Sequence, residues 1–527
     1  KNQYTGQNVD NAKRQWMYDR DPREICFQFN KRILGYFCID QLEVWMTTRL
    51  EGKNTYFLPF NQGSNGAGND GGKGNPANPD GYPTSYFWEY VFQKDSMMDI
   101  IQKFIHLQVK EEKKQMPDGS EQVTKKKRLI FPRYHQLDVV RKLIADVKKE
   151  GAGRNYLIQH SAGSGKTNSI AWLAHRLSSL HDDENTIIYD NIIIVTDRVV
   201  VDRQLQKAVI GMEHASGLIK VMDDRCSSSD LADALNGNTK IIATTIQKFP
   251  YIVEEVKNLN NKRFAVIIDE AHSSTSGKNM SAVTKSLASG EWEYDDTDEM
   301  IEDEIRKHGK QVNVSMFAFT ATPKPTTLQM FGRLNKNGQY EAFHIYSMKQ
   351  AIEEGFILDV LSNFTRYETF YQINKLVEND PRCKTNSAKR QIARFVQLHE
   401  TNIGQRIEVI VEHFKNMVMD ELGGQAKAMV ITSSRPEAVK YQKAFQKYIE
   451  HKGYKNIHAL VAFSGKVNLE GEEYTESSMN GFNEERLTKE FDKDEYQVLI
   501  VANKYQTGFD QPKLCAMYVL KKLKGVN

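Results

Sequence analysis

The stretch NYLIQHSAGSGKTNSI, residues 155–170, decides the fold class of this chain. NYLIQ has the composition of a strand, SAGSGKT that of a glycine-rich turn, and the following residues up to 180 that of a helix. In such a turn backbone N–H groups wrap phosphates, a lysine reaches the terminal phosphates and a threonine hydroxyl coordinates magnesium. The predicted nucleotide-binding residues are Ser161, Ala162, Gly163, Ser164, Gly165, Lys166 and Thr167.

The loop opens with an unusual residue, because His160 stands where this pattern normally has a small side chain. His160 precedes the glycines, so we expect that it does not need to touch phosphate. Short motifs also recur by accident, and a glycine-rich turn without a nucleotide is the alternative.

A second motif, FAVIIDEAH at 264–272, argues against that alternative. It places Asp269 and Glu270 at the carboxyl end of an apolar strand, where open α/β sheets bind ligands. Asp269 is predicted to hold magnesium, and Glu270 to orient or deprotonate the attacking water. The competing interpretation is that the two carboxylates cap a following helix.

The rest of the chain repeats the strand pattern of the opening stretch. Apolar, β-branched runs alternate with helical segments, as in parallel sheets that helices cover on both faces. The runs are NYLIQ, NIIIVTD, KIIATT, FAVIIDE, MFAFTAT, AMVITSS, HALVAFS, YQVLIVA and CAMYVL. A longer charged, helical region separates the first five runs from the last four, which predicts two RecA-like lobes in tandem.

Composition bounds the remaining possibilities. The chain has 527 residues, of which 40% are hydrophobic and 26% charged, with a net charge of +3. Any nucleic-acid partner must therefore be met by local basic patches. The five cysteines lack metal-ligand spacing, and no apolar run approaches the ~18 residues that cross a membrane, so we expect a cytoplasmic protein without a membrane partner.

Four segments divide the chain at changes in composition. The first mixes short apolar strands such as ICFQF and RILGYFCI with a glycine-rich loop at 61–83, which we expect to lie outside any core. The predicted segments are a small α/β unit at 1–109, a solvated charged linker at 110–128, the first RecA-like lobe at 129–344, and connecting helices with the second lobe at 345–527.

The order of the motifs resembles that of superfamily two helicases and translocases over residues 131–520. The resemblance implies that Gln136 reads adenine, that Gly508 and Asp510 complete the ATP site, and that hydrolysis is coupled to lobe movement by His272, Thr320, Ala321 and Thr322. His272 and Thr322 could equally be ordinary lobe-interface residues. The same resemblance implies that a further set of residues contacts the nucleic-acid backbone: Thr196, Arg198, Arg203, Thr245, Gln247, Lys248, Ser434, Arg435, Ser464 and Thr507.

Within that superfamily, QHSAGSGKT, DEAHSS, TTIQKF, AIEEGFILDV and YQTGFDQPKL resemble the motifs of the motor (R) subunit of type I restriction-modification enzymes. YFWEYVFQKDSMMDIIQKFIH resembles the segment that joins this subunit's nuclease domain to its motor. The resemblance implies an ATP- and Mg²⁺-dependent translocase and site-specific deoxyribonuclease that acts on double-stranded DNA. It also implies a specificity subunit and a methyltransferase subunit as partners.

That family's nuclease is of the PD-(D/E)xK type, and Lys1 matches its final catalytic lysine. Its acidic metal ligands would precede Lys1, and an arginine motif would follow residue 527, so we expect the fragment to be inactive or weak by itself. Gln15 and Tyr18 offer a partial match to the nuclease's Gln/Tyr helix motif, one residue too short, and an exposed helix face anchored by Trp16 is the alternative.

Two other functions stay open at this stage. A superfamily two DEAH-box helicase acting on RNA or DNA would share the ATP site. A nucleotide-gated scaffold that binds DNA without turnover would suit the fragment.

Overall fold

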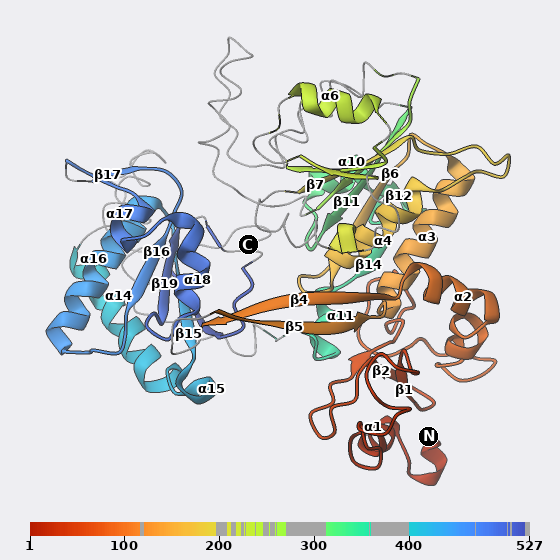
Figure 1. Ribbon diagram of the computed structural model, residues 1–527, viewed down its shortest axis with the longest axis horizontal. Coiled ribbons are helices and arrows are strands. Elements are labelled where there is room, and N and C mark those ends of the chain that lie inside the picture. Colours follow the sequence, from red (N-terminus) through yellow and green to blue (C-terminus); the bar gives the residue numbers. More distant parts are fainter. Residues whose placement is uncertain are drawn as a thin grey trace. The chain divides into compact units, whose positions relative to one another are not determined.

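A computed structural model gives the arrangement of the chain in two compact units (Figure 1). It describes residues 1–115, 121–196, 208–211, 218–222, 226, 228–237, 239–245, 252, 259, 261–269, 312–357, 359, 400–469, 471–502, 504–505 and 509–521. The first unit comprises residues 1–273 and 280–359, and the second comprises 274–279 and 360–527. Each unit is described by itself.

A seven-stranded sheet forms the centre of the first unit, with every pair of neighbours parallel. Its order is β14 (His344–Tyr346), β6 (Asn155–His160), β11 (Val314–Thr320), β10 (Phe264–Ile268), β7 (Asn191–Thr196), β9 (Ile241–Thr245) and β8 (Ile219–Val221). All residues of β7, β9 and β10 are buried, as strands covered on both faces require. The predicted parallel α/β class is confirmed.

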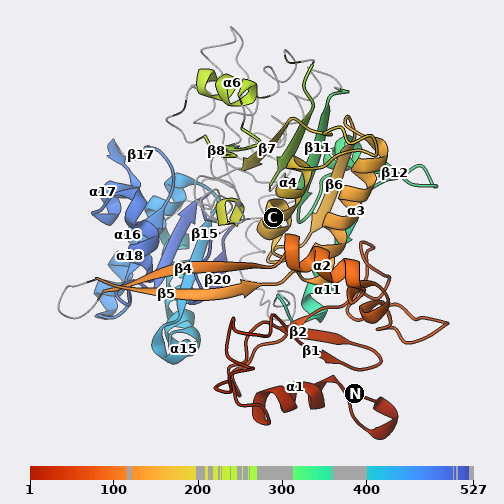
Figure 2. The ribbon, with the colours of Figure 1, turned by 45° about the vertical axis from the view of Figure 1, so that its right-hand side comes forward.

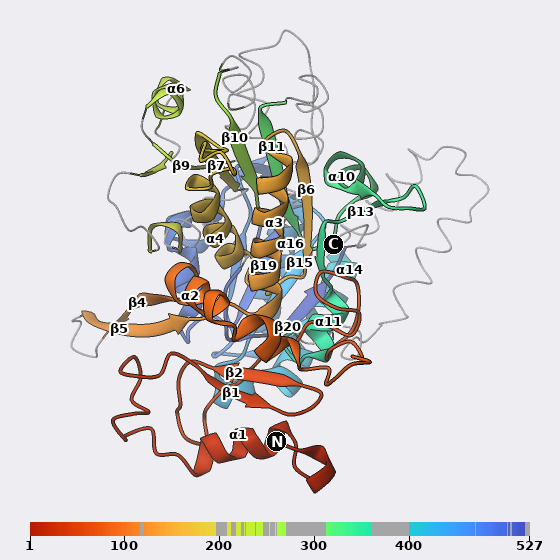
Figure 3. The same cartoon turned by 90° about the vertical axis from the view of Figure 1, so that its right-hand side faces the viewer.

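Alternate residues of these strands supply two hydrophobic cores. Ile192 and Ile194 of β7 join a core with α3 (Tyr134–Glu150) and α4 (Lys166–Ser178), which lie side by side on one face (Figure 3). Ile193 and Val195 join a core that includes residues of α6 (Ser228–Asn236) and α10 (Pro325–Phe331). The continuous apolar runs of the sequence are thus explained by burial on both faces.

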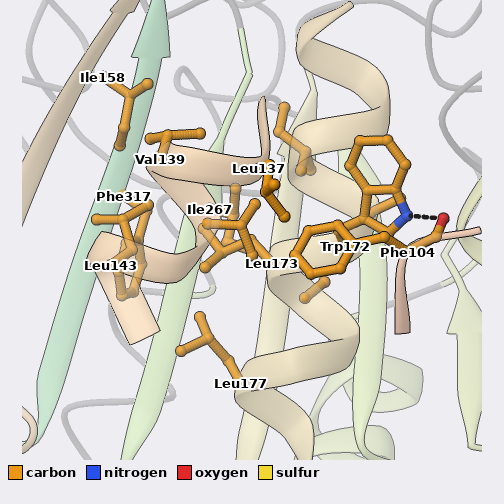
Figure 4. Packing of buried hydrophobic residues seen from close by; sticks show 14 of the residues in the cluster. Phe104, Leu137, Val139, Leu143, Ile158, Trp172, Leu173, Leu177, Ile267 and Phe317 are labelled. Carbon is orange, nitrogen blue, oxygen red and sulfur yellow. Dashed lines mark hydrogen bonds between the residues drawn. The ribbon is translucent and has the colours of Figure 1, made fainter. Parts of the chain in front are cut away.

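The first core continues without a break into the N-terminal segment. Trp172 of α4 is 1% exposed and donates its Nε1–H to the Phe104 carbonyl at 2.9 Å (Figure 4). That segment contains η1 (Gln3–Thr5), α1 (Val9–Tyr18), the antiparallel strands β1 (Tyr36–Ile39), β2 (Val44–Thr47) and β3 (Leu58–Pro59), the π-helix η2 (Phe87–Val91) and α2 (Lys94–Lys103). The border predicted at residue 109 does not coincide with a break in this core.

Two expectations for the N-terminal segment are wrong. ICFQF at 25–29 forms turns, and the Phe27 ring packs on Trp16 and Tyr36 instead of entering a sheet. The glycine-rich loop is not held outside the core, since Gly63, Gly71 and Gly72 are buried. Glycine permits this because a Cβ on Gly63 would lie 2.7 Å from the Gln350 side chain.

Residues 110–115 and 121–128, expected to belong to a solvated charged linker, lie instead in two paired antiparallel strands. β4 (His106–Gln115) and β5 (Glu121–Ile130) pair over ten residues each and extend as a separate two-stranded ribbon (Figure 2). Charged residues concealed the alternation of a ribbon that is exposed at Lys125, Lys126, Lys127 and Arg128.

The predicted lobe boundary at 344/345 is also wrong. β14 pairs with β6, and α11 (Met348–Glu353) follows it within the first unit, after the short pair β12 (Arg333–Leu334) and β13 (Tyr340–Glu341). The division between units falls at 359/360. A three-residue strand at a sheet edge carries too little sequence pattern to be recognised.

The second unit holds a parallel four-stranded sheet, which confirms the predicted second lobe. Its order is β16 (Ala459–Ala462), β19 (Val498–Ala502), β15 (Lys427–Thr432) and β20 (Leu514–Val519). The other elements are α14 (Glu400–His413), π-helix η4 (Phe414–Val418), α15 (Glu421–Gly424), α16 (Arg435–Lys452), β17 (Val467–Leu469), β18 (Glu472–Tyr474), α17 (Glu476–Asn480), η5 (Glu484–Arg486) and α18 (Leu487–Asp492).

Across the described residues, none of the helices combines the length and the apolar character that crossing a membrane requires.

Candidate nucleotide-binding site

The predicted nucleotide-binding residues, 161–167, are called the phosphate loop here. This loop connects the end of β6 to the first residues of α4, as the sequence predicts. Gly163 and Gly165 adopt positive φ angles of 73° and 81°, which favour glycine. A Cβ on Gly165 would lie 2.5 Å from Gln136 Nε2, so no other residue fits there without displacing that side chain.

Buried hydroxyl groups line this loop. Ser161 and Ser164 are 0% and 1% exposed, and their Oγ atoms have no hydrogen-bond partner among the described residues. Such groups cost free energy unless something bonds to them. A phosphate chain with its water and magnesium would supply those bonds, so the residues present fit ATP with Mg²⁺.

Lys166 and Thr167 begin α4. Lys166 is 8% exposed, with Nζ 3.5 Å from the His160 carbonyl oxygen, and Thr167 is half-buried. Both are therefore at the helix N-terminus, where the helix dipole favours anions.

The start of α3 is fixed to the back of the phosphate loop. Gln136 donates from Nε2 to the carbonyls of Ser164 (3.2 Å) and Gly165 (3.0 Å), while its Oε1 accepts from the Arg133 N–H. His135 Nε2 lies 3.0 Å from the same Ser164 carbonyl. The structure thus gives the Gln136 amide a contact with the loop, and its reading of adenine stays a prediction.

Asp269 and Thr320, two further predicted residues of the first lobe, lie at the same edge of the sheet. Asp269, 5% exposed, follows β10, and its N–H donates to the Val195 carbonyl at 2.9 Å. Thr320 ends β11 and accepts a hydrogen bond on Oγ1 from the Thr322 N–H, with Ala321 between them. Carboxyl ends of parallel strands meet at one edge, so Asp269 and the phosphate loop share it.

Predicted DNA contacts in this lobe are less accessible than expected. Thr196 and Thr245 are each 1% exposed, and Thr196 Oγ1 donates to the Thr244 carbonyl at 3.5 Å. Their contact with a nucleic-acid backbone stays a prediction. The predicted residues Arg198, Arg203, Gln247, Lys248, Glu270 and His272 lie outside the described part of the chain.

In the second unit the structure brings together two predicted DNA-contact residues. Arg435 Nη1 donates to the Ser464 carbonyl at 2.9 Å, and Ser434 caps α16 by accepting from the Glu437 N–H. Asp510 is exposed, whereas Thr507 and Gly508 lie outside the described residues.

The nuclease assignments find less support. Lys1 is half-buried, and among the residues that the structure describes no three or more His, Cys, Asp or Glu side chains come together as a metal-binding cluster. Gln15 and Tyr18 are exposed on α1, while Trp16 packs on Phe27 and Tyr36. This is the geometry of an exposed helix face anchored by Trp16.

A buried polar cluster behind the phosphate loop was missed. Arg133 Nη2 donates to the Tyr346 hydroxyl (2.6 Å) and pairs with Glu354 (3.0 Å), and the Tyr346 ring stacks on His135 at 3.8 Å. Burial raises the pKa of Glu354 and lowers that of His135. The sequence signal for this cluster is His160, whose ring lies 5.3 Å from that of His135 and which stands where a small residue is usual.

The fold and loop together define a class of structure: parallel α/β lobes, the first of which has a glycine-rich loop between a central strand and a helix, as phosphate-binding sites do. The SWI2/SNF2 ATPase family model matches residues 135–392. The chain is 27% identical over 430 residues to the type I restriction enzyme HindI endonuclease subunit of Haemophilus influenzae, covering 75% of this chain and 37% of that protein. It is 25% identical over 443 residues to the type I restriction enzyme SsaAORF53P endonuclease subunit of Staphylococcus saprophyticus, covering 75% and 41%.

The chain is thus a relative of the endonuclease subunits of type I restriction enzymes. It spans well under half the length of these relatives. A solved fragment assigned to an HsdR subunit of a Vibrio vulnificus type I restriction enzyme aligns with a TM-score of 0.44 at 14% identity, covering 92% of this chain and 68% of that one. A likeness of that size supports no conclusion.

Proposed function

We propose that this chain carries the ATP-driven motor of a type I restriction endonuclease subunit, which pulls duplex DNA before cleavage remote from the recognition site. The observation that carries the proposal is the phosphate loop, whose buried serine hydroxyls and helix N-terminus suit a nucleoside triphosphate. The relatives, all endonuclease subunits of type I enzymes, support the choice of this branch.

Lys166 would bind the terminal phosphates, and Thr167 with Asp269 would hold magnesium. Magnesium bound there neutralises the charge that develops on the transferred phosphoryl group. Glu270 would orient or deprotonate the attacking water, and Thr320, Ala321 and Thr322 would couple hydrolysis to movement. The Gln136 contacts keep the loop in its wrapped conformation before ATP arrives.

Duplex DNA would be held through its phosphates rather than read by sequence. The predicted contacts, of which Arg435 and Ser464 are joined in the structure, are side chains suited to the backbone. Sequence recognition would then come from a specificity subunit, with a methyltransferase subunit completing a cytoplasmic complex. Lys1 would belong to the nuclease active site of the intact protein.

The full-length protein that contains this chain provides the test. ATP hydrolysis is measured with linear duplex DNA, single-stranded DNA or RNA, first alone and then with the specificity and methyltransferase subunits. We expect turnover that requires duplex DNA and those subunits, is lost in Lys166→Ala and is retained in Lys149→Ala, a change at an exposed lysine of α3.

Other outcomes distinguish the alternatives. Turnover driven by RNA alone would reject the restriction motor in favour of a helicase acting on RNA. DNA binding that depends on ATP without any turnover would indicate a scaffold.

A further inference from the structure

Three side chains behind the phosphate loop form a hydrogen-bonded chain. His160 Nε2 lies 2.9 Å from His344 Nδ1, and His344 Nε2 lies 3.1 Å from Asp138 Oδ2. Both histidines are 0% exposed, and the Asp138 side chain is 16% exposed. Residues from the end of β6, the edge strand β14 and the second turn of α3 thus meet at one place.

The end of this chain fixes where each proton lies. Burial acts to raise the pKa of Asp138, but the hydrogen bond from His344 and the nearby Lys142 lower it, so Asp138 is a carboxylate that only accepts. His344 must then carry its proton on Nε2 and accept on Nδ1, and His160 must donate from Nε2. His160 Nδ1 is therefore the unprotonated atom, and it has no partner among the described residues.

Burial keeps both rings neutral. It lowers the pKa of His160 and His344, and the cations Lys166 and Arg133 lower that of His160 further. His135, also neutral, faces His160 at 5.3 Å between ring centroids. Positive charge behind the loop is thus left to Lys166 and Arg133.

His160 is the residue from which the phosphate loop departs. Its carbonyl faces Lys166 Nζ at 3.5 Å, its backbone is paired with Tyr346 of β14, and the next N–H, of Ser161, donates to the Tyr346 carbonyl at 3.0 Å. A ring held at this position holds the first residues of the loop. A ring without its acceptor would rotate or admit water, and the loop would shift with it.

The glycine-rich loop covers the outer side of the chain. A Cβ on Gly68 would lie 2.8 Å from His344 Cδ2, and the Ile345 N–H donates to the Gly68 carbonyl. Lys142 pairs with Asp138 at 2.7 Å and donates to the Ala67 carbonyl at 2.7 Å. Only a residue without a side chain allows such close cover of the imidazole.

We propose that Asp138, His344 and His160 act as a positioning relay that fixes the His160 ring, and with it the start of the phosphate loop, and so sets the affinity for ATP. This rests on the proposed nucleotide site. It assigns a role to the non-glycine start of the loop: the ring supplies order that the backbone of a small residue would not.

Two substitutions at one position separate the hydrogen bonds from the packing. His344→Gln keeps an acceptor for His160 and a donor for Asp138, whereas His344→Leu fills a similar volume with neither. In the full-length protein we measure the Kd of a fluorescent ATP analogue, the KM and kcat of hydrolysis, and the melting temperature. We expect His344→Leu to raise Kd and KM about tenfold, with kcat changed less than about threefold, and His344→Gln to stay near wild type.

The relay is overturned if both variants raise Kd equally, or if His344→Leu melts early while its ATP affinity is unchanged. Should His344→Leu fail to fold, Asp138→Asn takes its place, because it removes the charge that orients the chain and preserves the shape. An increase in Kd of about threefold or more supports the relay, and no change rejects it. Lys166→Ala serves as the reference: if it leaves ATP binding intact, the proposed nucleotide site itself is wrong.

Discussion

Each lobe has its own parallel sheet, and the residues at the carboxyl edges of the two sheets differ. In the first lobe, the buried residues at this edge include Ser161 and Ser164, whose hydroxyls find no partner among the described residues. In the second lobe, buried carboxylates occupy it. Glu437 accepts from the Ser433 N–H at 2.7 Å, and Glu476 accepts from the Phe463 N–H at 2.9 Å and pairs with Lys504 at 2.8 Å.

The difference teaches which edge is open to an anion. Carboxylates already accept from the Ser433 and Phe463 N–H groups of the second lobe, so these two donors are occupied and an anion there would meet negative charge. In the first lobe, the Ser161 and Ser164 hydroxyls can donate to a ligand that brings its own negative charge. Stability in the second lobe should therefore depend on these buried carboxylates, and ligand binding in the first on the phosphate loop.

The largest expected effect is on ATP affinity in the first lobe. Lys166→Ala removes charged hydrogen bonds to phosphate that are worth on the order of 3 kcal/mol, so the Kd for an ATP analogue should rise about a hundredfold. Isothermal titration measures it, with Lys149→Ala as the matched control. If the two variants had equal Kd values, Lys166 would not bind the nucleotide, and the proposed difference between the two lobes in anion binding would be wrong.

The next effect is on the stability of the second lobe. Glu437→Ala deprives the Ser433 N–H of its acceptor and leaves Arg406, 3.8 Å away and 8% exposed, without this carboxylate. We expect a loss of about 3 kcal/mol in the free energy of unfolding. Urea denaturation measures this loss, with hydrogen exchange as the probe that reports each lobe separately.

Exposed Glu450 on the same helix, changed to alanine, is the control for that loss. ATP affinity should be unchanged in Glu437→Ala. A loss confined to the first lobe would contradict the assignment.

Acid pH should change the stability of the two lobes in different ways. His135, His160 and His344 are neutral in the fold but take up protons when unfolded, near their ordinary pKa of 6.5. Their stabilisation is complete above that pH and is lost below it, by up to about 1.4 kcal/mol per pH unit for each group. Glu354, whose pKa burial raises, offsets part of this loss.

In the second lobe burial raises the pKa of Glu476, so its contribution strengthens as the pH falls. Hydrogen exchange at pH 7 and pH 5, corrected for the intrinsic exchange rate, should show weaker protection at acid pH in the first lobe only. His344→Gln should reduce the loss. Parallel loss in both lobes would refute this prediction.

The smallest expected effect concerns the exposed edge of the second lobe. Arg435 makes one described hydrogen bond, to the Ser464 carbonyl, so Arg435→Ala should change stability by less than about 0.5 kcal/mol. Duplex affinity should fall a few-fold, and the slope of log K against log salt should decrease by about 0.9. Filter binding at several salt concentrations compares it with exposed Lys447→Ala, and an unchanged slope would count against DNA contact at Arg435.

Elements with a long sequence pattern were predicted correctly, and those with a short or masked pattern were not. The long apolar runs gave every strand of both sheets except the three-residue β8 and β14, and the phosphate loop was placed correctly from eight residues. ICFQF failed because Phe27 packs against Trp16 and Tyr36 at a turn, where aromatic packing outweighs strand propensity. Charged residues concealed the pairing of β4 with β5, because they hide the apolar alternation by which a strand is recognised.

The sequence by itself determined the parallel α/β class, the phosphate loop and the position of Asp269 at a strand end, because each follows from local periodicity and glycine placement. Only the tertiary structure joined His160 to His344 and Asp138, and laid Gly68 against that ring. These residues are far apart in the chain, and their contact depends on the edge strand β14 pairing with β6. No local pattern encodes such a pairing, since it is selected by the burial of the whole sheet.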